Sequence, residues 1–148
     1  MDKSRAGASI LSIHRVLTDW GEGESSASGG EGSGGLAAEN DATWLHSFYA
    51  NKLWNKPGGD YKADSSSDMI VADEGIYTWS NTGLIEDVEY WLESPDLNFG
   101  WAIIGDESKT STAKRFISRN FSDPELHPRI IIEYSPCSPP SHIDSKIM

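Results

Sequence analysis

The chain has 148 residues, which is enough for one domain and too few for two of ordinary size. Its formal net charge is −11, and this excess of carboxylates argues against binding to nucleic acid or to an anionic membrane surface, because both depend on clustered Lys and Arg. Six Trp and five Tyr supply much of the apolar surface, and chains rich in aromatic and turn residues are typically β.

The sequence also limits the covalent chemistry and the compartment of the protein. Cys137 is the only cysteine, so no disulfide forms within one chain and no all-cysteine metal site exists. No run of about 20 apolar residues predicts a membrane span. Residues 1–8 are a polar segment without the apolar stretch of a signal peptide. We therefore expect the chain, as written, to remain in the cytoplasm, without a membrane partner.

The first half of the chain alternates strand signals with loops. Residues 9–17 are rich in Ile, Leu and Val and predict a strand, whereas residues 21–35 are almost wholly Gly, Ser and Glu and predict a flexible surface loop. Residues 41–49 predict a short helix, because Asp41 is a candidate N-cap and four large apolar residues follow at helical spacing.

Turn and strand signals continue beyond this helix. Residues 57–60 (Pro-Gly-Gly-Asp) predict a turn. Short apolar runs at 70–71 and 76–79 predict two strands. The clearest helix covers residues 84–92, with Thr82 as its cap and with Asp87 among the acidic residues of the solvent-facing side.

The last part of the chain predicts three more strands. Residues 101–104 and 129–134 are apolar runs, and residues 114–119 alternate charged with other side chains. Residues 135–148 predict a disordered tail. Together the elements predict a mainly β fold, an antiparallel β-sandwich with one or two short helices, in a single domain over residues 9–134.

Seven segments in this order resemble one family, the DNRLRE-type domains of bacteria and archaea. They are Ile13-His14-Arg15-Val16 with Asp19-Trp20-Gly21-Glu22-Gly23, Asp41-Ala42-Thr43-Trp44, Trp54 with Pro57-Gly58-Gly59-Asp60, Asp87-Val88 with Trp91-Leu92, Asn98-Phe99-Gly100-Trp101, Arg115-Phe116-Ile117-Ser118-Arg119, and Pro128-Arg129-Ile130-Ile131-Ile132-Glu133-Tyr134.

The resemblance implies a jelly-roll β-sandwich of the kind found in secreted or surface proteins, some of which are classed as carbohydrate-binding modules. It assigns no catalytic residue. Asn120 stands where relatives often carry Glu. Family members also usually begin with several strands before the segment that matches residues 9–17, so the chain resembles the later two-thirds of such a domain. A sandwich without its first strands has open edges, and we therefore expect a homodimer formed through sheet edges or faces.

Aromatic residues near loops and turns are the candidates for a glycan-binding surface, because flat rings stack on sugars. The candidates are Trp44, Trp54, Tyr61 and Trp79. Arg115 and Arg119 lie on the same face of the predicted strand over 114–119, where they would bind an acidic group of a sugar or pair with nearby carboxylates. Burial in the core is the alternative for each aromatic ring, and it is the role we expect for Trp91 and Trp101.

Acidic residues in loops are candidates for a structural calcium ion, which binds six to eight oxygen atoms. Asp19, Glu22, Asp41 and Asp60 occupy such loops, with solvated surface acids as the alternative. No other cofactor is expected. The leading hypothesis is a non-catalytic module that binds a glycan or cell-surface polymer. The alternatives are a structural or interaction protein completed by self-association and, less well supported, a glycan-active hydrolase or lyase, for which nothing selects a pair of carboxylates.

Overall fold

The computed structural model describes residues 7–25, 35–106, 108–110 and 112–135. These residues belong to two compact units, Met1–Arg115 and Phe116–Met148, and each is described by itself. In chain order the elements are β1 (Ser9–Arg15), β2 (His46–Phe48), β3 (Lys52–Leu53), β4 (Ser67–Val71), α1 (Thr82–Glu93), the 3-10 turn η1 (Pro95–Leu97), β5 (Trp101–Ile104) and the 3-10 turn η2 (Pro124–Leu126). The described regular structure is thus antiparallel sheet with one α-helix, which confirms the coarse prediction of a mainly β fold.

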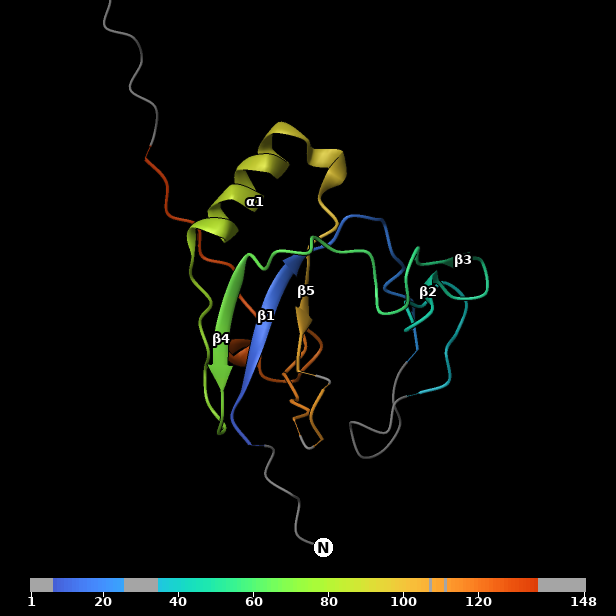
Figure 1. Ribbon diagram of the computed structural model, residues 1–148, viewed down its shortest axis with the longest axis horizontal. Helices are drawn as coiled ribbons and strands as arrows, with labels where there is room; N and C mark the ends of the chain where they lie inside the picture. Colours follow the sequence, from blue (N-terminus) through green and yellow to red (C-terminus); the bar gives the residue numbers. More distant parts are fainter. Residues whose placement is uncertain (1–6, 26–34, 107, 111, 136–148) are drawn as a thin grey trace, which may run out of the picture. The chain divides into compact units, whose positions relative to one another are not determined.

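A three-stranded antiparallel sheet forms the centre of the first unit, with the strand order β4-β1-β5 (Figure 1). Ile13 of β1 lies opposite Ser67 of β4 on one side and opposite Ile103 of β5 on the other. The β-branched residues of β1 favour an extended backbone. The strands predicted over 9–17, 70–71 and 101–104 are confirmed.

The two faces of this sheet differ in burial. Leu11 is 3% exposed and Val71 is 4% exposed, and both lie on the same face of the sheet as Arg15, whose side chain contacts α1. On the opposite face Ile10 pairs with Ile70, and these side chains are 56% and 64% exposed. Successive residues of a strand point to opposite faces, so the core lies on the helix side of the sheet.

The helix α1 begins at its N-cap Asn81, whose side chain accepts a hydrogen bond from the amide of Thr82. The predicted helix over 84–92 is confirmed, but its orientation about its own axis is not the expected one. Ile85 and Leu92 are 58% and 76% exposed, whereas Asp87, expected on the solvent-facing side, is 2% exposed. Trp91 is 8% exposed, as expected for a core residue.

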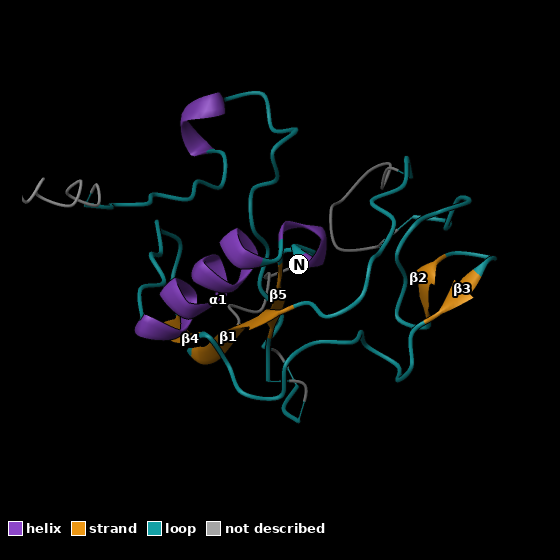
Figure 2. Ribbon diagram, turned by 90° about the horizontal axis from the view of Figure 1, so that it is seen from above, coloured by secondary structure: helices purple, strands orange, loops and turns teal. Residues whose placement is uncertain are grey.

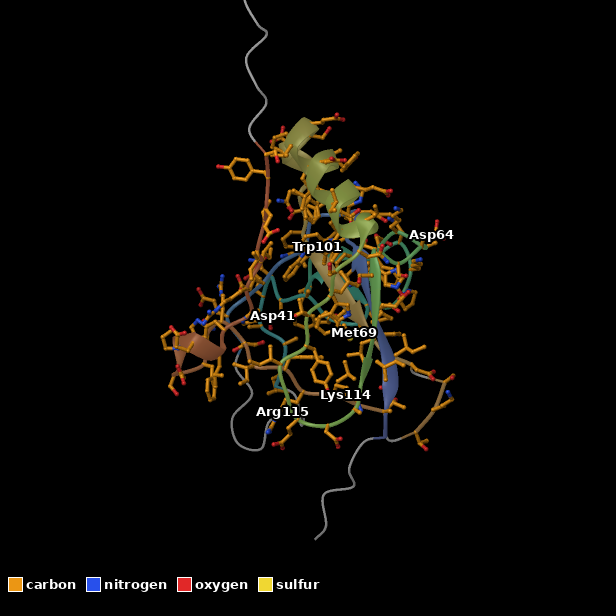
Figure 3. All side chains as sticks on the ribbon, turned by 90° about the vertical axis from the view of Figure 1, so that its left-hand side faces the viewer. Asp41, Asp64, Met69, Trp101, Lys114 and Arg115 are labelled. Atoms are coloured by element: carbon orange, nitrogen blue, oxygen red, sulfur yellow. The ribbon has the colours of Figure 1, made fainter. Side chains whose placement is uncertain are left out.

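Asp87 is buried because three polar side chains from the sheet side meet its carboxylate. The Oγ of Ser66 donates to Oδ2 at 2.5 Å, and Nε1 of Trp101 donates to the same oxygen at 2.7 Å. The Nε of Arg15 lies 3.3 Å from Oδ1 as an ion pair, without the alignment of a hydrogen bond. The Arg15 guanidinium also stacks on the Tyr90 ring, 3.8 Å from its centroid. Figure 3 shows Trp101 at the helix end of the sheet. A polar cluster thus joins α1 to all three strands or their immediate neighbours.

Gly83 permits the close approach of α1 to the start of β4. A Cβ atom at this position would lie 2.6 Å from the carbonyl oxygen of Ser66, which is closer than real Cβ contacts. The first turn of the helix therefore packs directly on the backbone of Ser66, whose side chain donates to Asp87.

Four predicted elements are not formed. Residues 41–49 contain β2 instead of a helix, because Asp41 and Thr43 bond to loop and turn amides and Ala50 adopts a positive φ of 65° that closes a hairpin. Residues 76–79 form no strand, since the side chains there bond to the sheet and to the adjacent loop: Nε1 of Trp79 donates to the Leu11 carbonyl.

Residues 114–119 form no strand either, and the boundary between the two units falls among them. Residues 129–134 also form no strand, because the described chain supplies them with no partner strand. The second unit contains η2, whose first turn is capped by the Asp123 carboxylate. Residues 26–34 of the predicted loop and residues 136–148 of the predicted tail, with Cys137, lie outside the described residues. Within the described chain, no helix has the length and apolar character needed to cross a membrane.

Candidate functional site

A small hairpin of β2 and β3 lies to the side of the three-stranded sheet (Figures 1 and 2). It is tied to the preceding loop at Gly21, whose amide donates to the Ser47 carbonyl and whose own carbonyl accepts from the amide of Ala42. A second tie lies beyond the hairpin, where Tyr61 forms an isolated antiparallel bridge with Val16. The chain within the hairpin and the chain after it are therefore both bonded to the segment that follows β1.

The Asp41 carboxylate holds the loop before this hairpin. It accepts hydrogen bonds from the backbone amides of Glu24, Ser25 and Ala38, and the residue is 4% exposed. Hydrogen bonds from the Ser25 side chain and then from the Ala38 amide lower the pKa of Asp41 below its ordinary value of 3.8, against the opposing effect of desolvation. Gly23, at φ 66°, leaves room for this carboxylate, since a Cβ there would lie 1.7 Å from Oδ1.

The loop around Asp41 should open as the solution is acidified. Because its pKa in the folded protein lies below 3.8, the carboxylate stabilises the loop above that pH, and the contribution is lost as the pH falls through the lower folded value. We expect the amide chemical shifts of Glu24, Ser25 and Ala38 to titrate together with a midpoint below 3.8. The Asp41→Asn variant should lack this transition. A midpoint at or above the ordinary value would contradict the assignment.

Three of the predicted ligand-binding aromatic residues gather around the turn at residues 57–60, and we name Trp44, Trp54 and Tyr61 the aromatic site. The Trp44 ring lies against Gly58, where a Cβ would come within 2.9 Å of the indole, and Gly58 donates its amide to the Trp44 carbonyl. Trp44 is 58% exposed. Gly58 and Gly59 both have positive φ, at 94° and 114°, which glycine adopts without strain.

The other two rings of the aromatic site are held by different contacts. Nε1 of the half-buried Trp54 donates to the Thr43 carbonyl at 2.9 Å. The half-buried Tyr61 ring packs on His14 at 5.1 Å between centroids, and Nζ of Lys56 lies 4.9 Å from the Tyr61 centroid. The site therefore consists of one well-exposed indole, two partly covered rings and one cation.

The remaining predicted ligand-binding residues lie elsewhere. Trp79 is half-buried and donates Nε1 to the Leu11 carbonyl of β1. Arg115 follows Lys114, whose Nζ donates to the Gly7 carbonyl just before β1, whereas the aromatic site is tied to the other end of that strand. Figure 3 likewise shows Arg115 at the end of the first unit away from α1. Arg119 belongs to the second unit.

The predicted calcium ligands have individual hydrogen-bonding roles. Asp60 accepts from the backbone amide and the side-chain amide of Asn55 at 3.0 and 2.8 Å, and Asp19 accepts from the amide of Trp20. Glu22 is exposed beside the loop that Asp41 closes. Within the residues that the structure describes, no group of three or more His, Cys, Asp or Glu side chains is arranged to hold a metal ion. Asp19, Asp41 and Asp60 act as acceptors of turn and loop amides.

Sequence reasoning missed two residues that complete the aromatic site, Lys56 and His14. Lys56 directly precedes the Pro57 turn, so its place next to Tyr61 follows from the turn that was predicted. His14 is brought to Tyr61 by the bridge between Val16 and Tyr61, and no local pattern in the sequence signals that pairing.

Comparison of the chain with protein-family models, with curated proteins and with solved structures finds no match.

Proposed function

We propose that this protein is a non-catalytic β module that binds a glycan through the aromatic site. The observation that carries the proposal is Trp44, which is 58% exposed although its ring is held against Gly58. A large indole that stays in contact with water while fixed in position offers a flat apolar surface at small entropic cost. Such a surface suits the CH face of a sugar ring.

Polar groups around the aromatic site complement this stacking surface. Lys56 and Asn55 are exposed directly before the turn, and their ammonium and amide groups are suited to sugar hydroxyls. Asp60 is 7% exposed and holds Asn55 in place by accepting from its side-chain amide. The net charge of −11 favours a neutral or basic glycan over an acidic one. No pair of carboxylates is assigned a role in turnover, and the proposal is binding alone.

The likeness to DNRLRE-type domains supports the same proposal at the level of the fold. We propose that the antiparallel strands belong to a jelly-roll arrangement, of which the sheet β4-β1-β5 would be one layer. A fold hosts many functions, and the proposed ligand follows from the aromatic site.

Trp44→Ala should reduce the affinity for any polysaccharide that binds the protein by about tenfold. This is the equivalent of roughly 1.5 kcal/mol for the loss of a partly covered apolar contact. The measurement is affinity electrophoresis across a panel of neutral polysaccharides, followed by calorimetry on any that retard the protein. Trp44→Phe keeps a ring and should retain much of the affinity.

Ile76→Ala is the matched control, because Ile76 is 90% exposed and lies outside the aromatic site. Its affinity should equal that of the unmodified protein. Binding that survives Trp44→Ala, or the absence of retardation by every polysaccharide in the panel, would contradict the proposal.

A further inference from the structure

Residues 129–134 present an unusual run of exposed apolar side chains. Ile130, Ile131 and Ile132 are 69%, 82% and 59% exposed, and Tyr134 is 83% exposed. Isolated exposed apolar residues are common at protein surfaces, but a contiguous run of this size marks a surface that contacts another molecule. The residue types also favour a strand, although the described chain gives this segment no strand partner.

The sequence of the segment defines how it would pair as a strand. Pro128 precedes it and Pro136 follows it, and proline donates no amide hydrogen bond to a ladder. In an extended chain Arg129, Ile131 and Glu133 point to one side, and Ile130 and Ile132 point to the other.

A second copy of the segment is complementary to it in one register. Two identical antiparallel strands related by a two-fold axis must pair one residue with its own copy, because directly opposite residues share a face of the ribbon. With Ile131 at the axis, Arg129 lies opposite Glu133 of the other copy at both ends, and Ile130 lies opposite Ile132. Opposite charges and matched apolar side chains both stabilise such cross-strand pairs.

The two neighbouring registers lack this complementarity. With Ile132 at the axis, Ile131 would face Glu133, and Arg129 would face Ser135. With Ile130 at the axis, Arg129 would face Ile131. The charge pattern of the segment thus favours a single register when two copies pair as antiparallel strands.

We infer that two copies of this protein associate by antiparallel pairing of residues 129–133 about Ile131. The four side chains of Ile130 and Ile132 form one apolar face of the ribbon, and two Arg129–Glu133 pairs flank the Ile131 pair on the other. This association is separate from glycan binding, because it uses none of the residues of the aromatic site.

The present contacts of Arg129 are compatible with this arrangement. Its Nη2 donates to the Glu125 carbonyl at 2.6 Å and to the Glu125 carboxylate at 3.1 Å. The two side chains of this ion pair are 54% and 83% exposed, and exposed pairs of this kind are weak. The guanidinium has five donor hydrogens, enough to serve the carboxylates of Glu125 and of Glu133 on the second copy.

Sedimentation velocity over a dilution series from high micromolar to nanomolar concentration tests the inference. The unmodified chain should form a dimer that dissociates on dilution. Glu133→Arg and Arg129→Glu should each weaken dimerisation by about tenfold or more, because one substitution creates two like-charge pairs in a symmetric interface. An equimolar mixture of the two variants should dimerise again, since both ends then bring opposite charges together.

Glu74→Arg is the matched control, as it makes the same change in charge at an exposed position outside the segment, and it should dimerise like the unmodified chain. Far-ultraviolet circular dichroism establishes that each variant is folded. A chain that is monomeric at every concentration, a Glu133→Arg variant that dimerises normally, or a mixture that stays monomeric would each overturn the inference.

Discussion

Asp87→Ala is expected to destabilise the protein by about 3 to 5 kcal/mol, the range for removing one partner of a buried ion pair. The Asp87 side chain is 2% exposed and that of Arg15 is 15% exposed, so neither charge is screened as a surface charge would be. Without the carboxylate, the Arg15 guanidinium remains buried without its counter-ion, and the Trp101 indole and the Ser66 hydroxyl lose their acceptor. Because the Arg15 contact is not an aligned hydrogen bond, the lower end of the range is expected.

Urea unfolding followed by Trp fluorescence measures this loss, since Trp91 and Trp101 pack at 4.5 Å between centroids next to Asp87. Glu86→Ala, at the exposed neighbouring position of α1, is the control and should change the free energy of unfolding by less than about 0.5 kcal/mol. Replacing both charges, as in Arg15→Met with Asp87→Leu, should cost less than Asp87→Ala alone. An Asp87→Ala protein as stable as the Glu86→Ala control would show that the cluster contributes nothing.

Gly21→Ala is expected to cost about 3 kcal/mol, at the upper end of the usual range for overpacking. A Cβ at Gly21 would lie 1.8 Å from the carbonyl oxygen of Asn40 and 3.0 Å from Cδ1 of Phe48. The first of these atoms belongs to the backbone and cannot rotate away, so the loop and the β2–β3 hairpin must separate. The aromatic site should lose its glycan affinity as well, because Trp44 and Trp54 flank that hairpin.

Gly105→Ala is the matched control for this substitution, because a Cβ at Gly105 would meet no atom within 4 Å. Amide chemical shifts should move across β2 and β3 in Gly21→Ala, while those of β4 and β1 stay in place. Equal stability of the two alanine variants would mean that the hairpin accommodates the methyl group, contrary to this account.

The elements that the sequence predicted correctly are those whose side-chain pattern alone decides the backbone. The β-branched residues of β1 and the helical spacing of α1 belong to this group. The hairpin was missed because four large apolar residues in 44–49 have the spacing of a helix. The bonds of Asp41 to the distant Glu24 and Ser25, together with the turn at Ala50, favour the hairpin instead. Local sequence patterns do not predict such long-range hydrogen-bond partners.

The same limit explains the errors at the level of single residues. Hydrophobic spacing predicted α1 but not which way it faces, since a carboxylate such as Asp87 is assigned to solvent until its buried partners are known. For the aromatic candidates, composition and nearby turns selected Trp44, Trp54 and Tyr61 together with Trp79. Only the contacts of each ring distinguish Trp79 from the other three candidates. The Trp79 indole donates a hydrogen bond to the Leu11 carbonyl of β1.

The position of β1 in the sheet has a consequence for the speed of folding. This strand lies near the start of the chain, yet its partners β4 and β5 begin only at Ser67 and Trp101. Contacts between residues so far apart require the closure of long loops, and such topologies fold slowly, on the scale of milliseconds to seconds. The β2–β3 hairpin closes locally and belongs to a class that forms in about 1–10 μs. The hairpin that Trp44 and Trp54 flank can thus form before the sheet. Formation of the sheet then sets the rate at which the whole protein reaches its native structure.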